Sequence, residues 1–390
     1  MNRSEAVARA LRSAAPHLLP EVLRDELRAR YGVLDAELLL ADYALAVLLP
    51  VPDAPGPTEP VALHGSPPGR AFGSQEPVVE RAGDGRAHAH LPVTVRGDRL
   101  GVLDVTLASV EQARADLDEL AELARVLGHE VTVAQRDTDV YHRARRRDRL
   151  TLAAEMQWQL LPARSSSRAE YALGAQLEPA YAIFGDNFDW STSADRLLLY
   201  LTNGMGEGID ASLLTNLGIN ALRNARRAGV PIADQAALAD QAVHAHYRGE
   251  AYLSVLLIDL DLASGRMLVV DAGSPRMLRL REGSVTAVDF EEQLPLGMFE
   301  ETDYTAQEFQ LVPGDRLVFV SDGVDGVTGP GGERYGERAL ARAITATRLL
   351  PASDVPGAVL RELAGHRGGP DLADDALVAC LDWFGPQDAG

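Results

Sequence analysis

The chain has 390 residues and a mass of 41.9 kDa, which is long enough for two or three domains. With a formal charge of −20 and no lysine, it is a poor candidate for general binding to nucleic acid or to an anionic membrane. Cys380 is the only cysteine, which excludes an internal disulfide and a cysteine-based zinc cluster. Because no signal peptide or long apolar stretch is evident, we expect a cytoplasmic protein.

The first part of the chain, residues 1–110, mixes helical and strand-like patterns. We expect a helix from Ser4, strand-like sequence over 38–51, and a hairpin of strands 90–95 and 99–107 around Arg96-Gly97-Asp98. The stretch AHLPVTVRGDRLGVLDVTLAS resembles the closing hairpin of GAF domains. The resemblance implies a GAF-like α/β sensor domain over residues 1–110; an α/β domain used only for dimerisation is the alternative.

The clearest periodicity in the sequence follows this hairpin. Apolar residues recur at alternating spacings of four and three positions, at Ala113, Leu117, Leu120, Ala124, Leu127, Val131 and Ala134. This heptad pattern predicts a coiled coil within a helical linker over residues 111–162, and a homodimer formed through residues 111–160. The alternative is that the helix packs on the domain before it.

The third part, residues 163–386, contains strands and helices in separate blocks, which predicts an α+β sandwich rather than a doubly wound sheet. Strands are expected over residues 173–177, 196–202, 252–259, 266–270, 315–321 and 376–382. Helices are expected over residues 209–227, 231–247 and 353–365.

Acidic residues stand at the ends of these strands and in the adjoining loops, at Asp186, Asp189, Asp322, Asp374 and Asp375. Carboxylates that converge from separate strand ends provide the hard oxygen ligands that Mg²⁺ and Mn²⁺ prefer. Within RLLLYLTNGMGEG, an apolar strand leads into a loop whose glycines allow the backbone to approach a ligand closely. These features together predict a divalent-metal centre, and two such ions can lower the pKa of a bridging water and stabilise a phosphoryl group under attack.

These motifs resemble the metal-dependent PPM (type 2C) phosphatases, in the bacterial SpoIIE/RsbU-like branch. The resemblance rests on AAEMQWQLLP, FGDNFDW, LTNGMGEG, LPLGM, LVPGDRLVFVSDGV and DLADDALVACL. It implies a PPM-type β-sandwich flanked by helices, Mn²⁺ or Mg²⁺ as cofactor, and hydrolysis of phosphoserine or phosphothreonine by a metal-activated water. Matched position by position, it implies a metal site made of Asp186, Asn203, Gly204, Asp322 and Asp375, with Asp374 as the alternative to Asp375.

The sequence departs from the family at Asn203, where the family has the aspartate that bridges both ions. Because an amide offers one neutral oxygen, it is a poor bridge, and we expect a weakened two-metal site. Glu207 and Asp189 are possible auxiliary ligands. Further departures are Phe184 in place of a glycine, Glu207 in place of a histidine, Gly326 in place of a glutamate, and DAGSP at residues 271–275.

Three functions are compatible with this sequence. The first is a metal-dependent serine/threonine phosphoprotein phosphatase of a bacterial signalling pathway, with an anti-sigma-factor antagonist as a substrate by family analogy. The second is a catalytically inactive pseudophosphatase that acts as a regulatory phosphoprotein-binding module. The third is a ligand-sensing dimer whose C-terminal domain is an interaction platform. The retained motifs at Asp186, Asp322 and Asp374-Asp375 favour the first function, and Asn203 favours the second. Tight binding of a small molecule to residues 1–110, with no metal dependence elsewhere, would favour the third.

Overall fold

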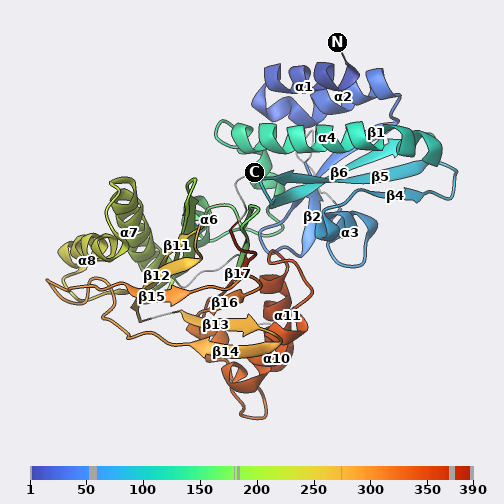
Figure 1. Cartoon of the computed structure of the whole chain (residues 1–390). Helices are drawn as coiled ribbons and strands as arrows, with labels where there is room; N and C mark the ends of the chain where they lie inside the picture. The colour runs from blue at the N-terminus through green and yellow to red at the C-terminus, as the bar shows by residue number, and fades with distance from the viewer. Residues whose placement is uncertain are drawn as a thin grey trace. The chain divides into compact units, whose positions relative to one another are not determined.

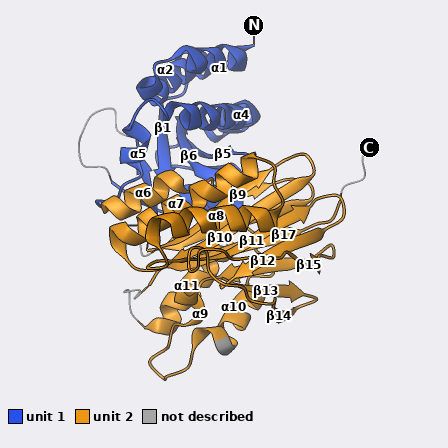
Figure 2. Cartoon of the chain, turned by 90° about the vertical axis from the view of Figure 1, so that its left-hand side faces the viewer, with its two compact units in different colours: residues 1–149 blue, residues 150–390 orange. Residues whose placement is uncertain are grey.

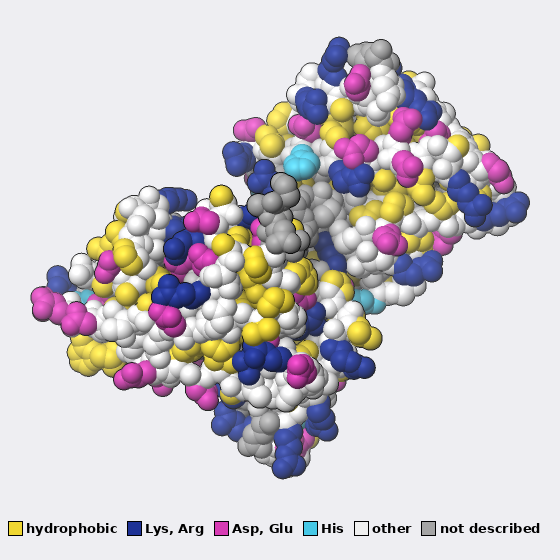
Figure 3. Space-filling view, in the orientation of Figure 1, with side chains coloured by type: hydrophobic (Ala, Val, Ile, Leu, Met, Phe, Trp, Pro, Cys, Tyr) yellow, Lys and Arg dark blue, Asp and Glu magenta, His cyan; other side chains and the backbone are white. Residues whose placement is uncertain are grey.

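The computed structural model describes residues 2–51, 59–179, 181, 185–273, 275–368 and 374–386. The chain forms two compact units, residues 1–149 and 150–390 (Figure 2), and each is described by itself. In the described part of the chain, no helix combines the length and the apolar character needed to cross a bilayer. On the face shown in Figure 3, arginine side chains are interspersed with aspartate and glutamate rather than gathered in one basic patch.

Unit 1 contains a six-stranded antiparallel sheet with the strand order β3-β2-β1-β6-β5-β4. Its strands are β1 (Asp35–Ala41), β2 (Val47–Pro50), β3 (Val61–Ala62), β4 (Val78–Arg81), β5 (Ala87–Val95) and β6 (Asp98–Leu107). Its helices are α1 (Arg3–Ser13), η1 (Pro16–Leu18), α2 (Leu19–Tyr31), α3 (Pro67–Ser74), α4 (Val110–Ala134) and α5 (Val140–Ala144). Helices α1, α2 and α4 lie on one face of the sheet (Figure 1), where their apolar residues share a core with β1, β5 and β6.

The predicted hairpin is present in unit 1 as β5 and β6. Arg96 and Gly97 form its turn with φ angles of 51° and 91°, which match the primed turns that join twisted antiparallel strands. The strand-like stretch 38–51 proves to be two strands, because Asp42 Oδ1 accepts hydrogen bonds from the amides of Ala46 and Val47 and closes a turn between them. The GAF resemblance of this unit stays a prediction.

Helix α4 corrects the coiled-coil prediction. Leu120, Ala124, Leu127 and Val131 are fully buried in the core of unit 1, and α4 packs against β5. An apolar stripe at heptad spacing can pack on a sheet as well as on a partner helix, and in this unit it packs on the sheet. Most of the predicted linker therefore belongs to unit 1, and the homodimer through residues 111–160 stays a prediction.

Unit 2 contains two antiparallel sheets with the strand orders β15-β12-β11-β10-β9 and β14-β13-β16-β17-β8-β7. The first sheet consists of β9 (Asp186–Thr192), β10 (Arg196–Gly204), β11 (Leu253–Asp261), β12 (Arg266–Ala272) and β15 (Gln307–Gln310). The second consists of β7 (Ser165–Ser167), β8 (Tyr171–Glu178), β13 (Arg276–Arg281), β14 (Ser284–Val288), β16 (Arg316–Val320) and β17 (Ala376–Trp383).

Helices cover the two sheets of unit 2 on opposite sides (Figure 2). Helices α7 (Gly208–Arg227) and α8 (Ile232–Tyr247) share a core with β10, β11 and β12. Helices α10 (Leu340–Ala346) and α11 (Val355–Arg367) share one with β13, β16 and β17. The remaining helices are α6 (Leu152–Leu160), α9 (Asp322–Asp325) and η2 (Tyr335–Ala339).

The helix–sheet–sheet–helix arrangement of unit 2 confirms the predicted α+β sandwich. Every strand and helix expected between residues 173 and 382 is present, with ends within two residues of the expected positions. The sequence analysis missed β7, β9, β13, β14, β15, α9, η2 and α10. Of these, β9 matters most for function, because it carries Asp186.

Candidate metal centre

Two adjacent strands bring the first predicted site residues together. Strand β10 carries a buried run, Leu199–Leu201, and the ladder between β9 and β10 pairs Asp186 with Asn203. Since Asp186 begins β9 and Asn203 stands one residue before the end of β10, both lie at the same edge of the sheet. The strand-end position predicted from the sequence is therefore confirmed for this pair.

Gly185 precedes Asp186 and connects three elements. Its carbonyl accepts hydrogen bonds from the Gly204 amide at 3.2 Å and from Thr215 Oγ1 of α7 at 2.8 Å. Its φ is 148°, and a Cβ at this position would lie 2.3 Å from the Gly204 carbonyl oxygen. Only glycine allows this close approach of the two chain segments.

Asp375, just before β17, holds the same loop from the second sheet. Its Oδ2 accepts hydrogen bonds from the amides of Gly185 at 2.7 Å and Asp186 at 3.1 Å, and the residue is 1% exposed. Asp374 is exposed, and its Oδ1 accepts a hydrogen bond from the Asp375 amide at 2.8 Å. The two adjacent carboxylates therefore make different contacts, which the sequence alone did not distinguish.

Asp322 begins α9, directly after β16, and completes the cluster. Asn203 Nδ2 donates a hydrogen bond to Asp322 Oδ1 at 2.6 Å. The same oxygen accepts the Gly323 amide at 3.1 Å. Hence the structure brings Asp186, Asn203, Asp322 and Asp375 to one place from four strand ends, with Gly204 beside them.

The carboxylates of this cluster lie close together, and their negative charges raise the pKa of Asp186 and Asp374. Burial raises the pKa of Asp186 well above its ordinary value, and the charges of Asp375, Asp322 and Asp374 raise it further, against a hydrogen bond from Ser321 that lowers it. Burial and the charge of Asp322 also raise the pKa of Asp374. Neither Asp186 nor Asp322 is paired with an arginine or histidine in the described part of the chain.

The residues of the cluster fit a divalent cation in part. Asp186 Oδ2 is buried and has no hydrogen-bond partner among the described residues, as expected for an oxygen that faces a cation. Within those residues, no three Asp, Glu, His or Cys side chains are arranged to hold a metal by themselves. A cation here would therefore also need main-chain carbonyl and water ligands, which Mg²⁺ and Mn²⁺ commonly use.

Asp189 lies outside the cluster, and its prediction as an auxiliary metal ligand is wrong. Successive side chains of a strand point to opposite faces, so Asp189 and Asp186, three positions apart on β9, point to opposite sides of the sheet. Asp189 is 1% exposed and forms ion pairs with Arg223 at 2.7 Å and Arg226 at 3.0 Å on α7. Its carboxylate attaches α7 to the sheet.

Glu207, the other possible auxiliary ligand, is exposed and immediately precedes α7. Its role stays a prediction. Phe184, one of the departures noted in the sequence, and Ser274 within the DAGSP segment lie outside the described residues.

Two residues beside the cluster were not singled out in the sequence. The Gln157 side-chain amide on α6 donates a hydrogen bond to the Asp186 main-chain carbonyl. Ser321 Oγ accepts the Leu377 amide at 3.0 Å and so joins the end of β16 to β17. Both lie within quoted motifs, AAEMQWQLLP and LVFVSDGV, which was the signal available for finding them.

Comparison with known proteins supports the fold and the family of this unit. Residues 193–384 match the family model described as stage II sporulation protein E (SpoIIE). Protein IcfG of Synechocystis sp. is 20% identical over 325 residues, which cover 72% of this chain and 50% of that protein. The chain therefore spans about half the length of this curated relative.

Two solved structures share the fold of this unit. The RsbU and RsbW domains of a Mycobacterium tuberculosis protein are 22% identical, with a TM-score of 0.50 over 56% of this chain and 61% of that chain. The SiaA PP2C domain of Pseudomonas aeruginosa is 21% identical, with a TM-score of 0.50 over 59% of this chain and 93% of that chain. Unit 2 therefore has the PP2C (PPM) phosphatase fold, and residues 193–384 within it are similar to the SpoIIE family.

Proposed function

We propose that unit 2 is a metal-dependent serine/threonine phosphoprotein phosphatase of a bacterial signalling pathway, with Mn²⁺ or Mg²⁺ as its cofactor. The observation that carries the proposal is the buried Asp186 carboxylate, whose Oδ2 has no hydrogen-bond partner among the described residues and which faces the charges of three other carboxylates. A divalent cation would compensate this charge. The match of residues 193–384 to the SpoIIE family model supports phosphoryl hydrolysis as the reaction.

The residues that would hold the cation are Asp186, Asp322 and Asp374, together with the Gly204 carbonyl. Asp374 is preferred over Asp375 because Asp375 Oδ2 already accepts two main-chain amides, whereas Asp374 is exposed. A bound cation would supply Lewis-acid polarisation of the phosphoryl group and a water of lowered pKa. Asp375 and Gly185 keep the loop before β9 in place, so the Asp186 carboxylate is oriented in advance.

We propose that Asn203 weakens this activity. Its amide donates to Asp322 and so occupies a carboxylate oxygen that a cation would need. It also contributes no charge of its own to attract a cation. The same hydrogen bond favours the second candidate function, a pseudophosphatase that binds phosphoproteins without turning them over.

The substrate that we propose is a phosphorylated protein, with an anti-sigma-factor antagonist as the candidate by family analogy. Support comes from the similar Mycobacterium tuberculosis structure, which contains RsbU and RsbW domains. Unit 1 is proposed as a GAF-like sensor domain that regulates unit 2.

The test is Mn²⁺-dependent hydrolysis of p-nitrophenyl phosphate by the full chain as wild type, Asn203→Asp and Asp322→Ala, with Glu301→Gln as an exposed acidic control. Activity in the wild type and Glu301→Gln but not in Asp322→Ala supports a working phosphatase. Activity in Asn203→Asp alone supports the pseudophosphatase. If no variant hydrolyses this substrate or a phosphoserine peptide with Mn²⁺ or Mg²⁺, the proposal is wrong.

A further inference from the structure

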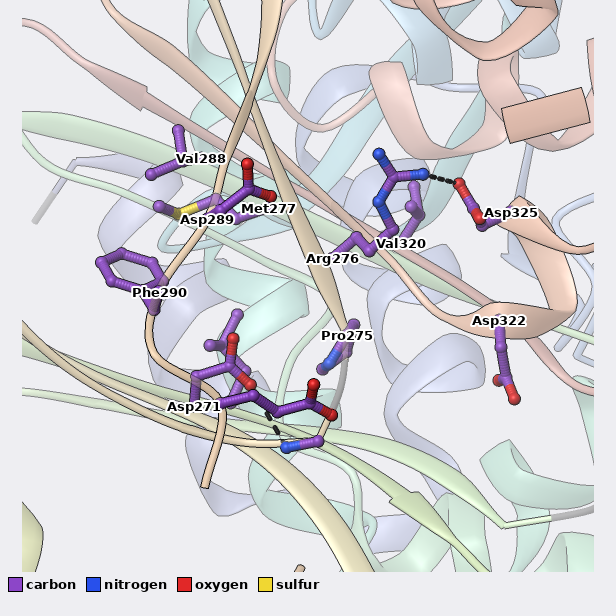
Figure 4. A pocket seen from close by; sticks show the side chains of 13 residues that line it. Asp271, Pro275, Arg276, Met277, Val288, Asp289, Phe290, Val320, Asp322 and Asp325 are labelled. Carbon is purple, nitrogen blue, oxygen red and sulfur yellow. Dashed lines mark hydrogen bonds and ion pairs between the residues drawn. The ribbon is translucent and has the colours of Figure 1, made fainter. Parts of the chain in front are cut away.

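A pocket of about 310 Å³ opens beside the candidate metal centre in unit 2 (Figure 4). It lies at the ends of β12, β13 and β16 and at the start of α9. Asp322 lines this pocket and also belongs to the carboxylate cluster. A ligand in the pocket would therefore be a neighbour of a group bound at the metal centre.

One wall of the pocket is apolar. Met277 and Val288 face each other across the β13–β14 ladder, and Phe290 follows them in the chain. Figure 4 shows these three side chains together on one side of the pocket, and Leu256 and Val320 also line it. This wall suits the methylene groups of a long side chain.

The polar lining is strongly acidic, with Asp271, Asp289 and Glu292 in addition to Asp322 and Asp325. Arg276 is the only cation among its described lining residues, and it is ion-paired with Asp325 (Figure 4). Asp325 lies 3.6 Å from a second arginine, Arg334. Arg276 is therefore held at Asp325, and the other carboxylates of the lining, Asp271, Asp289, Glu292 and Asp322, form no ion pair with an arginine of the described residues.

Asp271 is the most constrained of the remaining carboxylates. Its Oδ1 accepts the Gly273 amide at 3.2 Å, and it forms no ion pair with an arginine or histidine of the described residues. Burial raises its pKa, and the charge of Glu292 raises it further. A cation between Asp271 and Glu292 would favour the ionised form of both carboxylates, whereas an anion or a purely apolar group would not.

We propose that this pocket is a specificity site that takes a lysine or arginine side chain of the phosphoprotein, close in sequence to its phosphorylated residue. This inference rests on the proposed phosphatase function. The stem of the basic side chain packs on Met277, Val288 and Phe290. Its cationic head binds the carboxylates of Asp271, Asp289 and Glu292. The substrates of this protein are therefore phosphoproteins with a basic residue at a fixed distance from the phosphorylated one.

The test uses the full chain and a fluorescently labelled phosphoserine peptide in which one arginine is moved through each position on either side of the phosphoserine. Dissociation constants come from anisotropy, and kcat/KM from phosphate release. At one position, arginine should improve both quantities about tenfold over glutamine, since one charge-assisted contact of this kind is worth that much. Glu292→Gln and Asp289→Asn should remove most of this preference and leave p-nitrophenyl phosphate hydrolysis unchanged.

Glu291→Gln is the matched control, because Glu291 is exposed, adjacent to Glu292 and not part of the pocket lining. It separates the pocket from the general attraction of a chain with a charge of −20 for any basic peptide. A benefit of arginine that is equal at all positions, or that survives Glu292→Gln, would overturn the proposal. A positional preference in binding without any hydrolysis would support the pocket while the phosphatase function fails. Hydrolysis without a preference would refute the pocket alone.

Discussion

Asn203 on β10 and Asp322 at the start of α9 are 119 positions apart in the sequence and joined by a hydrogen bond of 2.6 Å. The amide N–H of Asn203 thus satisfies the carboxylate that a cation would otherwise satisfy. The hydrogen bond joins strand β10 of one sheet to the end of β16 in the other. On the proposed function, this contact would compete with a cation for Asp322.

The variant Asn203→Asp should therefore be less stable than the wild type in EDTA. It loses this hydrogen bond and adds a fifth carboxylate to the cluster, beside Asp186 and Asp322, at a cost of about 2 kcal/mol. With Mn²⁺ the order should reverse, because a ligand at a hundred times its dissociation constant stabilises the folded state by about 2.7 kcal/mol. Thermal unfolding in EDTA and in Mn²⁺ measures both effects.

Asn203→Ala is the control for this experiment, since it removes the hydrogen bond without adding a charge. It should lose stability in EDTA and regain little with Mn²⁺. If isothermal titration finds two tight Mn²⁺ sites in the wild type that Asn203→Asp leaves unchanged, the account of Asn203 is wrong.

Asp189→Asn should destabilise unit 2 by about 3 kcal/mol and leave the Mn²⁺ affinity as it is. The carboxylate is 2% exposed, and its removal leaves the charges of Arg223 and Arg226 without their partner. Urea unfolding and calorimetric Mn²⁺ titration of the same samples test the two statements. A large fall in Mn²⁺ affinity with unchanged stability would return Asp189 to the metal site.

Gly185→Ala should abolish Mn²⁺ binding and cost about 2 kcal/mol or more. The new methyl group would lie 2.3 Å from the Gly204 carbonyl oxygen and separate β9 from the end of β10. Gly208→Ala is the matched control, because its φ of 66° is also left-handed but no atom lies within 4 Å of its added Cβ. Equal loss of Mn²⁺ binding in both variants would show that backbone strain, rather than this contact, is responsible.

The stability of unit 2 should fall in acid through Asp315. Burial raises the pKa of this group, but hydrogen bonds from Arg281 and from the Val312 amide outweigh burial and leave the pKa below its ordinary value. Because its pKa is lower in the folded state, the group stabilises the fold above about pH 4. That contribution is lost as the pH falls through the folded-state pKa.

Asp315→Asn should cost about 2 kcal/mol at neutral pH, a moderate value because Arg281 is 35% exposed. Its stability should also depend less on pH in the acid range than that of the wild type. Urea unfolding from neutral pH downward measures both. The exposed pair of Glu308 with Arg266 serves as comparison, and Glu308→Gln should change nothing measurable.

Leu127→Ala in α4 should destabilise unit 1 by about 3 kcal/mol, since the side chain is fully buried. The unfolding temperature of unit 1 should not change with protein concentration, because the core is within one chain. Val133→Ala, on the exposed side of the same helix, should have almost no effect. A midpoint that rises with concentration and loses this dependence in Leu127→Ala would reinstate the coiled coil.

Much of unit 2 was predictable because its signals are local. The buried run Leu199–Leu201 in β10 and the glycine turn at Gly204 can be recognised from neighbouring residues. Because the strand ends could be located in this way, the acidic residues beside them could be predicted to converge. The opposite placement of Asp186 and Asp189 required the bounds of β9, which the sequence analysis had missed. The arginines that form ion pairs with Asp189 lie on α7, and no local sequence pattern predicts a contact between a strand and a later helix.

The heptad pattern in α4 likewise did not identify its tertiary partner. Periodicity states that one face of a helix is apolar, but it does not state what covers that face. A six-stranded sheet covers it here. The hydrogen bond between Asn203 and Asp322 could not be predicted either. The sequence showed that Asn203 lacks the charge of the family's aspartate, but it did not show that its amide would bind Asp322.

The Gln157 side chain on α6 donates to the main-chain carbonyl of Asp186, so the docking of this helix and the binding of a cation at Asp186 share one loop. Thermodynamic linkage is reciprocal: the free energy by which α6 docking favours cation binding equals that by which the cation favours docking. Helix α6 begins two residues after unit 2 itself begins. A signal that alters the docking of this helix would thus change the affinity for the metal. Conversely, a change in metal concentration would change the stability of the docked helix.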